Sequence, residues 1–141
     1  MTTTRKFLIF TLRNILYALD LAQVAEVCDP PQMSPIPLAP ACYGGVLNFH
    51  GEIVAVIDLA LFLALPGVSS PGKVIVLSQE AVSLAFLVDM VVRIVPEDEV
   101  SFSTPPDNFA AAMLNLSDGN AIQLDLDALV HEIEMGILRS L

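Results

Sequence analysis

The stretch from residue 44 to residue 59 limits most strongly how this chain can fold. Two short apolar runs, 46–49 and 53–57, flank a connection at residues 50–52 that is centred on Gly51. Short runs rich in Val and Ile and bounded by Gly are typical of β-strands. Gly also adopts the positive φ of a tight turn without a Cβ clash. The sequence therefore predicts a β-hairpin at this place.

The second strand of this hairpin, 53–57, offers no polar residue on either alternation. It must be covered on both faces, which favours a place inside the domain over a surface position. We expect four of its side chains to be largely buried: Ile53, Val54, Val56 and Ile57. Asp58 follows directly, and its carboxylate can cap a short helix over residues 59–63.

The apolar excess of the chain raises the question of a membrane segment. The 141 residues are 55% apolar with a mean hydropathy of +0.69. A spanning helix needs ~20 consecutive apolar residues, and the best candidate, 53–65, is shorter and contains Asp58. The apolar run after Arg5 and Lys6 is shorter than a signal-peptide core. We therefore expect one cytoplasmic domain over residues 1–141, without a transmembrane helix.

The net charge of the chain disfavours some classes of binding partner. The formal net charge is −10, and only six basic residues are present, scattered along the chain. Nucleic acid and anionic membrane are disfavoured, because both require clustered Lys and Arg. The acidic excess either keeps an apolar protein in solution or forms a face for a basic partner, and composition leaves both open.

Two groups of short strands are predicted along the chain. Residues 29–40 are rich in Pro and are expected to form an ordered extended arm, because Pro lacks a backbone donor. Turn residues at 65–72 mark the best internal boundary. The approximate subdomains are therefore 14–70 and 71–135.

The second half of the chain predicts one more hairpin and one helix. Residues 117–120 separate two apolar runs and carry Asp-Gly at the turn. The segment 82–95 is expected to be one long strand or two strands with a bend near Asp89. Apolar residues between 126 and 137 recur at helical spacing, which predicts a C-terminal amphipathic helix. About nine or ten short strands with little helix favour β-barrels or sandwiches.

No pattern of catalytic or metal-binding residues stands out. His50 and His131 have no ligand cluster near them in the sequence, and Cys28 and Cys42 lack metal-type spacing. The two cysteines fit reduced, partly buried thiols better than a disulfide. Phosphate-loop and nucleophile-elbow motifs are not found. We expect no catalytic residues, no metal and no cofactor.

Several segments, in their order along the chain, carry a resemblance to a known family. The most specific are Gly-Val-Leu-Asn-Phe-His-Gly at 45–51 and Ile-Val-Ala-Val-Ile-Asp-Leu at 53–59. The other matching blocks are 7–12, 17–20, 24–27, 36–40, 87–91 and 124–129. Together they resemble the chemotaxis coupling protein family, the CheW-like domain, from about residue 7 to residue 130.

The resemblance implies a mainly β fold. Two small five-stranded SH3/OB-like β-barrels would pack over a shared apolar core, with a short C-terminal helix and a first strand able to cross between them. It also implies a non-enzymatic adaptor that couples a chemoreceptor cytoplasmic tip to the regulatory domain of a chemotaxis histidine kinase. A small-ligand-binding β-barrel protein and an enzyme of unrecognised type are the alternatives. A deep polar pocket would favour these, and shallow apolar grooves at strand edges would favour the adaptor.

By the same resemblance, four residues are candidate partner contacts: Val24, Glu26, Gly45 and His50. The family usually has Arg where this chain has His50. Arg offers a permanent charge and a planar fork, and His offers neither reliably at neutral pH. Coupling is therefore expected to be altered, weaker or directed at a different partner. Val24 has an alternative role in packing alone, and Gly45 has one in backbone geometry alone.

Overall fold

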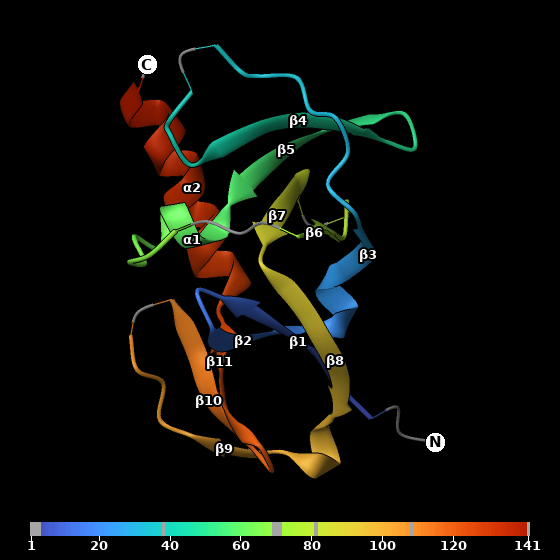
Figure 1. The fold of residues 1–141 in the computed structure, drawn as a ribbon, viewed down its shortest axis with the longest axis vertical. Helices are drawn as coiled ribbons and strands as arrows, with labels where there is room; N and C mark the ends of the chain where they lie inside the picture. The colour runs from blue at the N-terminus through green and yellow to red at the C-terminus, as the bar shows by residue number, and fades with distance from the viewer. Residues whose placement is uncertain (1–3, 38, 69–71, 81, 108, 141) are drawn as a thin grey trace.

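Two β-sheets and one long helix make up the molecule (Figure 1). The computed structural model describes residues 4–37, 39–68, 72–80, 82–107 and 109–140. The strands are β1 (Lys6–Leu12), β2 (Ile15–Asp20), β3 (Val24–Cys28), β4 (Tyr43–Phe49), β5 (Glu52–Asp58), β6 (Lys73–Leu77), β7 (Leu84–Val88), β8 (Met90–Pro96), β9 (Ser101–Ser103), β10 (Ala110–Leu116) and β11 (Gly119–Leu124). The helices are the 3₁₀-helices η1 (Leu21–Gln23) and η2 (Glu97–Glu99) and the α-helices α1 (Leu59–Phe62) and α2 (Leu126–Ser140).

The strands form a six-stranded and a five-stranded sheet. Their orders are β8-β1-β2-β11-β10-β9 and β3-β6-β7-β5-β4. The pairs β2–β11 and β5–β7 are parallel, and the other neighbouring pairs are antiparallel. Neither sheet closes on itself among the described strands, so two closed five-stranded barrels are not confirmed. The mainly β character and the C-terminal helix are confirmed.

The Pro-rich arm explains why the five-stranded sheet stays open. After β3 the chain returns beside β4, but the described residues of the two segments share a single β-bridge, between Ser34 and Val46. The bridge has two backbone hydrogen bonds, of 3.1 Å and 2.8 Å. Prolines on both sides of Ser34 lack the N–H groups that a longer ladder would need. The arm therefore covers part of the β4 edge without becoming a strand.

The chain passes between the sheets twice. β1 and β2 belong to the six-stranded sheet, β3 to β7 build the other, and the chain returns at Asp89 between β7 and β8. The predicted bend near Asp89 is confirmed. The Asp89 carboxylate accepts a hydrogen bond of 2.7 Å from the N–H of Arg13, which holds the β1–β2 turn against this junction. β6 pairs with β3 and β7 pairs with β5, so strands before and after residue 70 belong to one sheet.

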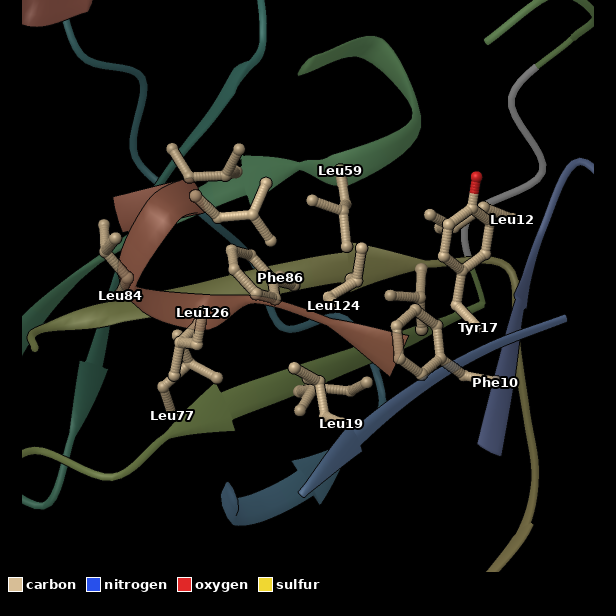
Figure 2. Packing of buried hydrophobic residues seen from close by; sticks show 14 of the residues in the cluster. Phe10, Leu12, Tyr17, Leu19, Leu59, Leu77, Leu84, Phe86, Leu124 and Leu126 are labelled. Carbon is tan, nitrogen blue, oxygen red and sulfur yellow. The ribbon is translucent and has the colours of Figure 1, made fainter. Parts of the chain in front are cut away.

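A shared apolar core lies between the two sheets, as the resemblance implied. Figure 2 shows side chains of both sheets, among them Leu19 and Phe86, in one cluster with Leu126 of α2. Each fully buried side chain of this size contributes roughly 1.5–3 kcal/mol to stability. Smaller clusters cover the remaining buried faces of the two sheets. The core therefore joins the sheets into one unit.

The β4–β5 hairpin has the predicted turn and the predicted helix cap. His50 and Gly51 have φ values of 50° and 87°, the pair of positive values that a two-residue type I′ turn requires. Asn48 Oδ1 accepts a hydrogen bond of 2.9 Å from the Gly51 N–H, which fixes the turn. Beyond β5, Asp58 accepts one of 3.2 Å from the Leu61 N–H and so caps α1.

The burial predicted for β5 is right at three positions and wrong at one. β5 lies between β4 and β7, and Val54, Val56 and Ile57 are fully buried. Ile53 is 66% exposed. Pairing with β7 begins only at Ala55, so the turn-proximal end of β5 extends beyond the neighbouring strand that would cover it.

The C-terminal helix α2 follows the predicted spacing. Leu126, Leu129 and Ile133 are buried in the shared core, and Asp125 Oδ1 caps the first turn by accepting a hydrogen bond of 3.2 Å from the Ala128 N–H. Figure 1 shows α2 running beside the five-stranded sheet toward the C-terminus. None of the helices in the described part of the chain combines the length and apolar character needed to cross a membrane.

Candidate partner-binding surfaces

His50 is exposed at the tip of the β4–β5 hairpin. Its imidazole packs edge-on against the Phe49 ring, with centroids 4.4 Å apart and planes at 65°. The Asn48–Gly51 hydrogen bond restrains the backbone beneath it. The ring therefore has a defined direction and an open side, from which it can form single hydrogen bonds to a partner. It cannot form the bidentate contact that Arg makes with a carboxylate.

Gly45 occupies a different environment, inside β4. It is buried, and its φ is +138°, a conformation that side-chain-bearing residues rarely adopt. A Cβ built at this position would lie 2.7 Å from the Ser34 carbonyl oxygen and 3.0 Å from the Met33 Cβ. The absence of a side chain thus lets the Pro-rich arm approach β4 closely. This geometry accounts for a glycine here without a partner.

Val24 and Glu26 lie on β3, at one edge of the five-stranded sheet. Val24 is half-buried and packs against the shared core, whereas Glu26 is exposed. The pairing of β3 with β6 shifts register between these two residues. Among the described strands β3 pairs only with β6, so its other side offers backbone groups to a partner. Val27 adds an exposed apolar side chain to the strand.

The four candidate residues do not form one patch along the sheet. β3 and β4 are opposite edges of the five-stranded sheet, with β6, β7 and β5 between them. Val24 and Glu26 therefore belong to one edge, and His50 to the hairpin turn at the other. Gly45 is beneath the Pro-rich arm.

Sequence reasoning missed a row of exposed apolar side chains on β8. Met90, Val92 and Ile94 alternate along the strand and are 60%, 40% and 50% exposed. We call these three residues the β8 stripe. β8 is an edge strand of the six-stranded sheet, and exposed apolar side chains on a sheet edge are typical of a protein contact. The sequence predicted a strand here, but its edge position depends on pairing with the distant β1.

The His, Cys, Asp and Glu side chains of the described residues are dispersed. None of them forms a group of three or more His, Cys, Asp or Glu side chains that could hold a metal ion. Cys28 and Cys42 are free, and burial raises the pKa of both thiols, which makes them poor nucleophiles at neutral pH. The exposed apolar strand edges are thus the more prominent surface features.

Comparison with known proteins identifies the family. The model of the CheW-like domain matches residues 6–134. This chain belongs to the CheW-like domain family. It is 31% identical to Chemotaxis protein CheW of Klebsiella aerogenes, over 97% of this chain and 88% of that protein. It is 28% identical to Chemotaxis protein CheW of Thermotoga maritima, over 82% and 81%.

The fold of this CheW-like domain is also found in a solved structure. The crystal structure of scaffolding protein TtCheW from Thermoanaerobacter tengcongensis matches with a TM-score of 0.75 and 26% identity. The match covers 87% of this chain and 90% of that one. The CheW-like resemblance that the sequence blocks carry is therefore confirmed in both sequence and fold.

Proposed function

We propose that this chain is a non-enzymatic adaptor of chemotaxis-type signalling in the cytoplasm. It couples the cytoplasmic tip of a chemoreceptor to the regulatory domain of a chemotaxis histidine kinase. The observation that carries the proposal is the CheW-like family match over residues 6–134. The description of TtCheW as a scaffolding protein supports it, since that protein shares the fold.

The surface of the domain is consistent with protein contacts as its main task. The β8 stripe and Val27 present apolar side chains at sheet edges, where a partner surface can cover them. His50 presents a polar ring on a restrained turn. An adaptor that holds two partners at once needs two such surfaces that do not overlap. We assign the β3 edge with the β8 stripe to one group of contacts and the His50 turn to another.

The first test replaces an apolar residue of the β8 stripe. Calorimetric titrations would measure the affinity of the full chain for a receptor tip fragment and, separately, for the kinase regulatory domain of the same cell. Ile94→Asp is expected to weaken at least one affinity by about tenfold or more, because it places a charge in an apolar contact. Val68→Asp is the matched control, since Val68 is an exposed apolar residue on a loop. Failure of the wild type to bind either partner would refute the adaptor function.

The second test concerns His50. His50→Arg is expected to tighten binding to a partner that keeps an acidic group opposite the turn, by about fivefold for one added charged hydrogen bond. His131→Arg on exposed α2 surface is the control. Equal affinities of wild type and His50→Arg for both partners would remove His50 from the contact residues.

A further inference from the structure

A hollow of about 280 Å³ opens between α1 with the loop after it and the six-stranded sheet. Its walls include Tyr17, Phe62, Leu65, Asp107, Phe109 and Leu124. Phe62 and Leu65 come from α1 and the loop after it, whereas Tyr17 and Leu124 come from β2 and β11. Its volume is close to the lower end of the range for small-molecule sites. We call it the α1 hollow.

Most of the side chains that line the α1 hollow are aromatic or aliphatic. The Phe62 and Phe109 rings lie 6.1 Å apart, with their planes at 56°. Both rings are only partly buried, so they keep accessible apolar surface within the hollow. Tilted aromatic rings at this spacing favour contact with another ring or with an alkyl chain. The lining therefore suits the apolar body of a small molecule.

Asp107 adds one fixed charge to this lining. Its Oδ1 accepts a hydrogen bond of 2.9 Å from the Phe109 N–H, and the Phe109 carbonyl oxygen accepts one of 2.6 Å from the Asp125 N–H. These hydrogen bonds hold the Asp107 carboxylate beside the start of β10. Among the described residues, no Lys or Arg forms an ion pair with Asp107. The carboxylate is therefore available to a cation from outside the chain.

The charge of Asp107 acts within the hollow. Burial, and then the negative charge of Asp107, raise the pKa of Tyr17, which forms part of the wall. The Tyr17 hydroxyl consequently stays neutral and can still donate or accept a hydrogen bond. Negative potential in a partly enclosed apolar site favours a cation and disfavours an anion of the same shape.

We propose that the α1 hollow binds a small amphipathic monoamine. Its aromatic or alkyl body lies against Phe62 and Phe109, and its ammonium group donates hydrogen bonds to the Asp107 carboxylate. The site is separate from the β3 edge, the β8 stripe and the His50 turn. Its test is therefore independent of the test of the adaptor function. A ligand that binds only the folded chain would contact α1, β2 and β11 together and would stabilise the fold by mass action.

The test uses three ligands of one shape and different charge. 2-Phenylethylammonium, neutral 2-phenylethanol and anionic 3-phenylpropionate would be titrated into the full chain labelled with ¹⁵N, and amide shifts would be followed by NMR. The ammonium is expected to give saturable shifts at the residues that line the hollow. The alcohol should bind about tenfold more weakly, because it lacks the charge-assisted bond, and the anion should not bind.

Asp107→Asn tests the carboxylate itself. Asn keeps the side-chain oxygen that accepts from the Phe109 N–H, so the local fold is retained while the charge is lost. We expect the affinity for the ammonium to fall about threefold to tenfold. Asp98→Asn, on exposed η2 outside the hollow, should leave the affinity unchanged and controls for overall charge. Thermal unfolding of both variants would confirm that they are folded.

Four outcomes would overturn the proposal. They are the absence of saturable shifts up to ~10 mM ligand, a generous limit for a fragment-sized molecule, shifts centred outside the hollow, equal affinity for alcohol and ammonium, and equal effects of Asp107→Asn and Asp98→Asn. Saturable binding at the hollow that requires both the ammonium and Asp107 would establish the site.

Discussion

Replacing Gly45 by Ala tests how the Pro-rich arm is held on β4. The new Cβ would meet the Ser34 carbonyl oxygen at 2.7 Å, and this backbone atom cannot rotate away as a side chain could. A residue other than Gly at the φ of +138° costs about 1–3 kcal/mol. Displacement of the arm would also weaken the two hydrogen bonds between Ser34 and Val46, at about 0.5–1.5 kcal/mol each. We expect the free energy of unfolding to fall by about 2–4 kcal/mol. The costs do not add in full, because displacement of the arm relieves part of the strain at residue 45.

The assay is urea unfolding followed by circular dichroism, since the chain contains no Trp. Gly44→Ala is a matched control in the same strand. Its Cβ would lie 3.8 Å from the Val56 carbonyl oxygen, an ordinary van der Waals distance, and Gly44 does not have a positive φ. The free energy of unfolding of the Gly44→Ala variant should differ from that of the wild type by about 0.5 kcal/mol or less. Equal stabilities of the two variants would refute the close approach of the arm to β4.

Three further outcomes are expected from similar measurements. Val56→Ala should lower the free energy of unfolding by roughly 1–3 kcal/mol, because it leaves a cavity among fully buried residues. Ile53→Ala should change it by about 0.5 kcal/mol or less, since Ile53 is exposed, and a larger loss would mean that the end of β5 is covered. Burial raises the pKa of Tyr43 to about 12 from 10.0, and its buried hydroxyl has no hydrogen-bond partner among the described residues. Tyr43→Phe should therefore be as stable as wild type or more stable at pH 7. Wild type should lose stability relative to this variant as the pH rises from 10.0 toward about 12, because the unfolded chain releases the tyrosine proton first. A difference that stays constant over this range would contradict the burial of the hydroxyl.

Local features of the fold were predictable from the sequence. The turn at His50 and Gly51, and the cap that Asp58 provides to α1, each depend on a few neighbouring residues. The side-chain chemistry of those residues already determines the conformation. The buried face of α2 could be predicted equally well from the sequence, since helical periodicity is a local property.

Features that depend on distant pairing were not predictable in the same way. The exposure of Ile53 depends on where β7 begins to pair, and the edge position of the β8 stripe depends on the pairing of β8 with the distant β1. The open five-stranded sheet depends on the Pro-rich arm forming only the bridge at Ser34 among its described residues. The resemblance supplied the candidate contacts, but only the strand order separates the β3 edge from the His50 turn.

The position of β3 to β7 within the chain has a consequence for its synthesis on the ribosome. All five strands of one sheet are contiguous in sequence, so this sheet can be completed as soon as β7 has emerged. The β1–β2 hairpin is made first but must wait, because β1 pairs with β8, and Tyr17 of β2 pairs with Ile122 of β11. Long-range pairing of this kind slows folding and leaves strand edges exposed in the meantime. A nascent chain halted after β7 would thus carry a finished five-stranded sheet beside an apolar hairpin with two open edges.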